Sequence, residues 1–94
     1  MSLYAVTYAY DQRADLQDQV RPAHRAYLRG LADRAKLRGS GPYTDGAPGA
    51  LLIFAADDRA ELDGLLADDP FAQAGVISDT QVREWALLTG PWAD

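Results

Sequence analysis

The stretch LYAVTYAY, residues 3–10, decides how the rest of the chain can be arranged. Its aromatic and β-branched residues are typical of a β-strand. Side chains alternate along a strand, so one face carries tyrosines and a valine while the other carries small or aliphatic residues. The stretch GALLIFAA, residues 49–56, is also apolar on both faces. Both strands are therefore expected at the centre of a sheet that is covered on both sides.

Two segments outside these strands are expected to be helices. Residues 22–37 carry apolar side chains at helical spacing. They begin with Pro22, which is favoured in a first turn because the N–H that it lacks would have no helical partner there. Gly39 is expected to end the helix. The polar stretch DQRADLQDQV, residues 11–20, precedes the helix and is expected to be a connection. The second helix is expected to open at Asp58, with Glu61 placed as in a capping box.

Two weaker strands complete the pattern. Residues 37–44 contain two glycines and Pro42, and since proline cannot donate to a β-ladder they indicate an edge or bulged strand. A short helical piece is expected to begin at Pro70. Residues 76–88 form the last strand, with a bend near Ser78. The order is βαββαβ, which predicts an α+β, ferredoxin-like fold: a four-stranded antiparallel sheet with two helices on one face.

The sheet has one face more than two helices can cover. The central strands are apolar on both faces, so the uncovered face must meet something else. A second copy of the chain is the simplest candidate, and a homodimer with sheets packed face to face is predicted. The alternative is a monomer whose extended tail folds across the sheet.

Composition narrows the classes of function. The 94 residues are expected to form a single domain over residues 1–94. No cysteine is present, which removes disulfides, thiolate nucleophiles and cysteine-based metal sites, and a lone histidine makes a histidine-based metal site improbable. The formal charge of −5 disfavours nucleic acid and anionic membranes as partners. No apolar run approaches the roughly 20 residues of a membrane span. A cytoplasmic protein without a metal or cofactor is expected.

The lone histidine, His24, is the strongest candidate for chemistry. The βαββαβ order brings the start of the first helix, the end of the second strand and the end of the second helix to one pole of the sheet. His24, the Gly41-Pro42 stretch and Asp69 are therefore expected to meet there.

Three short motifs, at matching spacings along essentially the whole chain, resemble the YciI-like (YCII-related) family. They are RPAH at residues 21–24, SGP at 40–42, and DPF at 69–71 followed by Gly75-Val76. That family belongs to the dimeric α+β barrel group of ferredoxin-like folds. The resemblance implies a His–Asp pair in a cleft at the strand ends, which maps onto His24 and Asp69. Related proteins include a dehydrochlorinase that acts on a chlorinated aromatic diol.

The expected pair suits proton transfer. In a first helical turn, the positive end of the helix dipole would favour a neutral imidazole that can accept a proton. Asp69 would bind the other ring nitrogen of His24 and fix its tautomer. No nucleophilic side chain is needed, which indicates proton transfer or elimination. The competing interpretation is that His24 only packs and that Asp69 only caps the short helix.

Other residues are expected to bind a ligand at the same pole. Ser40 could donate a hydrogen bond to a ligand, beside Gly41 and Pro42 at the same strand end. Tyr8, Tyr43 and Phe71 could line an apolar pocket. Arg21 could bind an anionic group at its mouth. Each also has a structural interpretation, as a small strand residue, a core aromatic residue or a solvated charge. The sequence therefore leaves three hypotheses: a cofactor-free lyase, isomerase or dehydrochlorinase-like enzyme, a non-catalytic small-molecule-binding dimer, and a structural dimer.

Overall fold

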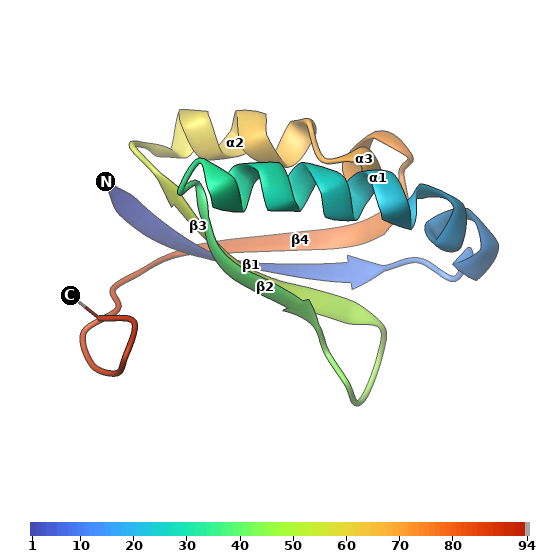
Figure 1. Cartoon of the computed structure of the whole chain (residues 1–94). Helices are drawn as coiled ribbons and strands as arrows, with labels where there is room; N and C mark the ends of the chain where they lie inside the picture. Colours follow the sequence, from blue (N-terminus) through green and yellow to red (C-terminus); the bar gives the residue numbers. More distant parts are fainter. Residues whose placement is uncertain (94) are drawn as a thin grey trace.

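The computed structural model, which describes residues 1–93, is built on one antiparallel sheet (Figure 1). The last residue of the single domain expected over 1–94 lies outside the described part. The strands, in sheet order, are β2 (Leu37–Pro42), β3 (Gly49–Ala56), β1 (Ser2–Tyr10) and β4 (Ile77–Trp85). The two strands with apolar residues on both faces, β1 and β3, are the central pair, as predicted. The order of the elements confirms the α+β, ferredoxin-like fold.

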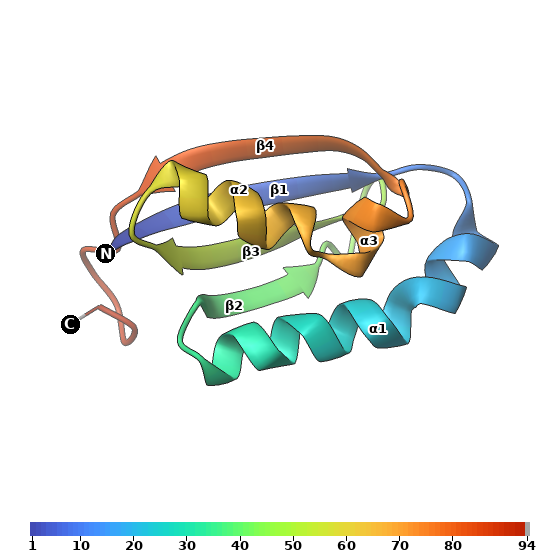
Figure 2. The ribbon, with the colours of Figure 1, turned by 90° about the horizontal axis from the view of Figure 1, so that it is seen from above.

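All helices lie on one face of the sheet (Figure 1). They are α1 (Ala14–Asp33), α2 (Arg59–Ala67) and the short α3 (Pro70–Gln73). Seen from above, α1 runs beside β2, while α2 and α3 lie over the central strands (Figure 2). The tyrosine-bearing face of β1 turns toward the helices: Tyr4 pairs with Phe54 and Val6 with Leu52, and all four are buried. This layer is the core.

The prediction that the first helix starts at Pro22 is wrong. Helix α1 begins at Ala14, so most of the expected connection is helical and Pro22 lies inside the helix. Leu16 and Val20, both half-buried, continue the apolar stripe toward the N-terminus. Proline cannot donate the usual bond to the carbonyl four residues back, and such a site commonly bends a helix. Figure 2 shows the first turns of α1 at an angle to the rest.

The C-terminal end of α1 also differs from the prediction. The helix ends at Asp33 rather than near residue 37, and Gly39 belongs to β2 instead of stopping the helix. Ala35 takes a left-handed conformation with φ 59°. The next N–H, that of Lys36, donates to the Leu31 carbonyl at 2.8 Å. This is the closing geometry that a glycine usually supplies.

The caps and the bend follow the sequence pattern more closely. Asp58 accepts a hydrogen bond from the Glu61 N–H at 2.8 Å and caps α2 as predicted. Pairing between β1 and β4 shifts between Ala9 and Tyr10, which leaves Ser78 unpaired and confirms the bend there. Strands β2 and β4 are shorter than predicted, ending at residues 42 and 85.

The second face of the sheet is not covered by a helix in the described chain (Figure 1). It carries the alternate residues of the central strands, with Ala5 opposite Ile53. Leu51 and Trp85 are each 40% exposed. Figure 1 shows residues 86–93 leaving the end of the sheet rather than crossing it, so this tail does not cover the apolar face. No helix within residues 1–93 is long and apolar enough to cross a membrane.

Candidate active site

A buried hydrogen bond joins the two residues predicted to form the acid–base pair. His24 lies on α1, and Asp69 directly precedes α3. Nδ1 of His24 is 2.7 Å from Oδ1 of Asp69. The exposed fractions of the two residues are only 7% and 1%. The fold thus brings these residues into direct contact across 45 positions of sequence.

Asp69 is held from three sides. Its Oδ1 also accepts a hydrogen bond from the Phe71 N–H at 2.9 Å, so it is the N-cap of α3, as the Asp-Pro sequence predicts. Its Oδ2 accepts a hydrogen bond from the Tyr8 hydroxyl at 3.0 Å. An ionised Asp69 can only accept, which requires the hydrogen of a neutral His24 ring to be on Nδ1. Nε2 then carries the free lone pair.

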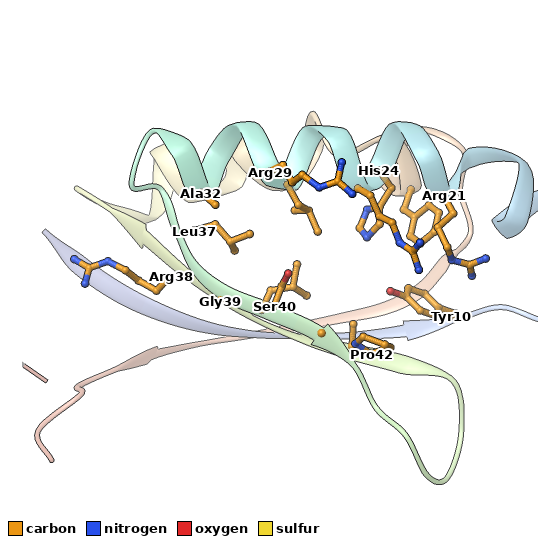
Figure 3. A pocket seen from close by; sticks show the side chains of 16 residues that line it. Tyr10, Arg21, His24, Arg29, Ala32, Leu37, Arg38, Gly39, Ser40 and Pro42 are labelled. Carbon is orange, nitrogen blue, oxygen red and sulfur yellow. The ribbon is translucent and has the colours of Figure 1, made fainter. Parts of the chain in front are cut away.

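Nε2 of His24 is open to an adjacent cavity. No buried side-chain nitrogen or oxygen within residues 1–93 lacks a hydrogen-bond partner. Nε2 has no such partner in this part of the chain, so it must be reachable from outside. Figure 3 shows the His24 ring directed from α1 into the space above Ser40. The unprotonated nitrogen of the pair therefore faces the cavity.

Aromatic packing fixes the orientation of the histidine ring. Phe71 stacks on His24 with ring centroids 3.9 Å apart and planes 5° from parallel. Tyr10 meets Phe71 edge-on, with centroids 5.4 Å apart. The His24 ring is stacked on one face by Phe71 and hydrogen-bonded at Nδ1 by Asp69. It therefore has little freedom left to lose when a ligand binds, which favours precise proton transfer.

The cavity between α1 and β2 has a volume of about 360 Å³. This is within the range of small-molecule sites. The side of the cavity formed by β2 and β3 is mainly apolar, and the side formed by α1 carries arginines. Its lining includes Tyr10, Arg21, His24, Ser40, Pro42 and Phe71. Within residues 1–93, no group of three or more potential metal ligands is present.

The structure gathers most, but not all, of the residues predicted to bind a ligand. Arg21, Ser40, Gly41, Pro42 and Phe71 line the cavity together with His24. Tyr8 does not line it but lies behind the pair, where it holds Asp69. Tyr43 follows β2 in an exposed loop outside the cavity and is 44% exposed.

The electrostatic reason predicted for His24 is wrong. His24 lies ten residues after Ala14, the first residue of α1, and therefore far from the positive helix end. Asp69, rather than the helix dipole, determines which ring nitrogen of His24 carries the hydrogen.

The tyrosines around the pair remain protonated hydrogen-bond donors. Burial, the charge of Asp69 and its hydrogen bond raise the pKa of Tyr8 well above the ordinary value. Burial and the charge of Asp69 also raise the pKa of Tyr10, partly offset by Arg21. Tyr10 thus presents a neutral hydroxyl to the cavity, able to donate to an oxygen of a ligand.

Sequence reasoning missed several cavity residues. Tyr10, Arg25 and Arg29 all line the cavity, although none of them is among the residues predicted to bind a ligand. The available signal was the spacing of Arg21, Arg25 and Arg29 by four residues, which places them along one face of a helix.

Comparisons with known proteins show the family and the fold of the chain. The model of the YCII-related domain family matches residues 1–86. The chain belongs to this family. It is similar over 98% of its length to a 5-chloro-2-hydroxyhydroquinone dehydrochlorinase from Burkholderia phenoliruptrix AC1100, solved in complex with 2,5-dihydroxybenzoquinone. The identity is 26%, the TM-score is 0.80, and 99% of that chain is covered.

More distant structures share the fold of this YCII-related protein. An uncharacterised NIPSNAP domain protein from Burkholderia xenovorans has a TM-score of 0.58 at 19% identity, covering 100% of this chain and 99% of the other. A dimeric ferredoxin-like protein of unknown function from Jannaschia sp. CCS1 has a TM-score of 0.53 at 21% identity, covering 93% and 100%. No curated protein matches the chain.

Proposed function

We propose that this YCII-related protein is a cofactor-free enzyme that moves a proton on a small oxygenated ring compound. The reaction class is a lyase, isomerase or dehydrochlorinase-like reaction. One observation carries the proposal: Nδ1 of His24 bonds to the buried Asp69 at 2.7 Å while the His24 ring lines a cavity of about 360 Å³. A buried carboxylate behind a histidine is the arrangement that orients a general base.

The proposed step follows from the hydrogen-bond directions. Nε2 of His24 takes a proton from a C–H or O–H group of the substrate, and the released electron pair moves into the substrate. Asp69 stabilises the imidazolium through Nδ1. In an isomerisation, Nε2 returns the proton to another atom. In an elimination, the electron pair expels a leaving anion, and the imidazolium gives its proton to water.

Two neighbouring hydroxyls suit the oxygen atoms of such a substrate. Tyr10 and Ser40 both line the cavity and can donate a hydrogen bond to a carbonyl or phenolate oxygen. A donor at this position stabilises the negative charge that develops after proton removal. The likeness to a dehydrochlorinase with a bound dihydroxybenzoquinone supports an oxygenated ring as the substrate class.

The proposed assembly is a homodimer through the open sheet face. That face presents Leu51 and Trp85, each 40% exposed, beside half-buried small residues such as Ala5. Exposed apolar patches of this kind are typical of interfaces. The likeness to a dimeric ferredoxin-like protein supports a dimer.

A proton-exchange assay tests the proposed reaction. Chlorinated and unchlorinated hydroxyhydroquinones are incubated with the protein in D₂O, and deuterium uptake and chloride release are followed. The intact protein is expected to accelerate one of these, and His24→Gln to lower the rate by roughly 10²–10⁴-fold while remaining folded. Arg34→Gln, at the far end of α1 and outside the cavity lining, serves as the control and should retain full rate.

Two results would contradict this proposal. Full activity in His24→Gln would remove the histidine from the reaction. Saturable binding of these rings without exchange or chloride release would favour the second candidate, a small-molecule-binding dimer that uses the same cavity.

A further inference from the structure

Three arginines of α1 form a row along the cavity. Arg21, Arg25 and Arg29 are spaced by four residues, so they follow one face of the helix. All three line the cavity that contains His24. Figure 3 shows Arg21 and Arg29 on either side of His24 along α1. The row therefore runs past the proposed base rather than along an unrelated part of the surface.

Within residues 1–93, two arginines of this row have no ion-pair or hydrogen-bond partner for their side chains. Arg21 pairs with Asp18, and its guanidinium lies 5.9 Å from the Phe71 ring centre. The side chains of Arg25 and Arg29 form no ion pair or hydrogen bond within residues 1–93. Both are exposed toward solvent and line the cavity at once. Their charges are therefore available to a ligand.

The cavity lacks any acidic lining residue to balance these charges. Among the 16 residues drawn as its lining, no Asp or Glu is present. Arg38 also belongs to the lining, but Figure 3 shows its guanidinium pointing away from His24. The whole chain has 14 acidic and 9 basic residues, so a cationic cavity runs against the overall charge. Such a local field concentrates anions at the entrance.

The opposite wall is suited to a flat apolar body. Leu37 and Pro42 of β2 and Ala50 and Leu52 of β3 contribute to it. An apolar wall with a few convergent charges is the usual form of a site that orients a small molecule. A ring against this wall would place a charged substituent near the arginines and a ring atom near Nε2 of His24.

We propose that the natural ligand is an anionic ring compound that carries a carboxylate recognised by Arg25 and Arg29. This inference rests on the proposed function for the position of the reacting atom, but the recognition of charge is separate from the chemistry. Arginine binds carboxylates through two parallel N–H donors, which fixes direction as well as charge.

A matched pair of probes tests the recognition of charge. The dissociation constants of 2,5-dihydroxybenzoate and of its uncharged amide are measured by calorimetry on the full chain. The acid is expected to bind about tenfold more tightly, because each solvent-exposed arginine contributes roughly a three- to fivefold gain. Raising the salt from about 50 mM to about 500 mM should reduce the affinity for the acid and leave that for the amide nearly unchanged.

Variants assign the preference to the arginine row. Arg25→Gln combined with Arg29→Gln should bring the affinity for the acid down to that for the amide, with the affinity for the amide within about twofold of the intact protein. The control Arg34→Gln removes one charge from the end of the same helix, outside the lining, and should change neither constant by more than about twofold. Unchanged thermal unfolding of the double variant shows that it folds.

The outcomes separate this inference from the proposed function. Equal binding of acid and amide, or no binding of either, would overturn the recognition of an anion. An acid preference that survives in the double variant would overturn its assignment to Arg25 and Arg29. Proton exchange on neutral rings, together with equal affinities for the acid and the amide, would support the proposed reaction and overturn the recognition of a carboxylate. A preference for the acid that depends on the arginines, without any exchange, would support the inference and count against the reaction.

Discussion

At the scale of the residue, Asp69 connects the fold to the candidate site. One carboxylate caps α3, holds His24 and accepts the Tyr8 hydroxyl. The Asp-Pro sequence predicts the cap, and the resemblance to a family implies the pairing with His24. The contact with Tyr8 could not be predicted, since the alternation of a strand shows which face Tyr8 occupies but not which atom lies opposite.

Tyr8→Phe should weaken the protein without changing its fold. The substitution removes a buried donor and leaves Oδ2 of Asp69 without a partner. The free energy of unfolding is expected to fall by about 1–3 kcal/mol. Urea denaturation measures this change, with Tyr43→Phe in the exposed loop as the control that stays within about 0.5 kcal/mol. Equal stabilities of the two variants would show that the hydroxyl contributes nothing.

The same substitution should change the response to alkaline pH. Because burial and Asp69 raise the pKa of Tyr8, the unfolded chain loses this proton at a lower pH than the folded chain does. The contribution is complete below the ordinary tyrosine pKa of about 10 and is lost as the pH rises above it. The stability of the intact protein should thus fall more steeply above that pH than the stability of Tyr8→Phe. Parallel curves would contradict the burial of a neutral tyrosine.

At the scale of the element, local signals predicted strands and caps better than the ends of the long helix. β3 and the cap at Asp58 agree with the prediction. Helix α1 does not, because Pro22 is a first-turn signal that the continuing apolar stripe overrides. Its other end closes at Ala35, a residue type that gives no stop signal. Tertiary packing decides both ends.

Gly30→Ala and Ala35→Gly test the helical interior of α1 and the left-handed residue that follows it. Gly30→Ala should stabilise the protein by about 1 kcal/mol, because the added methyl group meets nothing within 4 Å and glycine disfavours a helix interior. Ala35→Gly should stabilise it by about 0.5–1 kcal/mol, because φ is 59° there.

Gly49→Ala should have the opposite effect and destabilise the protein. Its methyl group would lie 2.4 Å from the Tyr8 carbonyl oxygen, so a loss of about 1–3 kcal/mol is expected. Thermal denaturation of the three variants measures the signs. A destabilised Gly30→Ala or a neutral Gly49→Ala would contradict the packing described for these positions.

At the scale of the whole molecule, β1 and β3 are apolar on both faces, but the helices of one chain cover only one of these faces. The helices cover the face with Tyr4, Val6 and Tyr8, whereas Leu51 and Trp85 stay 40% exposed on the other. The sequence predicted this uncovered apolar face correctly, because alternate residues of a strand show the composition of both of its faces. The arrangement of the arginines around the cavity could not be predicted, since it depends on how α1 lies against β2.

A charge placed on the open face should separate the proposed dimer. The intact protein is expected to have twice the 10.2 kDa chain mass in solution, and Leu51→Glu should shift it to the single-chain mass because a buried unpaired carboxylate is costly. Ala60→Glu, exposed on α2, is the control that should stay dimeric. Light scattering at micromolar concentration decides. A monomeric intact protein, or a dimeric Leu51→Glu, would contradict the proposed interface.

Asp69 is expected to hold the hydrogen of His24 on Nδ1 and to leave Nε2 free to accept a proton. His24 is the only histidine of the chain, so its ring nitrogens can be observed without overlap by nitrogen-15 NMR at a pH at which the ring is neutral. The predicted result is a protonated Nδ1 and an unprotonated Nε2, with this preference lost in Asp69→Asn. A hydrogen on Nε2 of the intact protein would contradict this tautomer of His24.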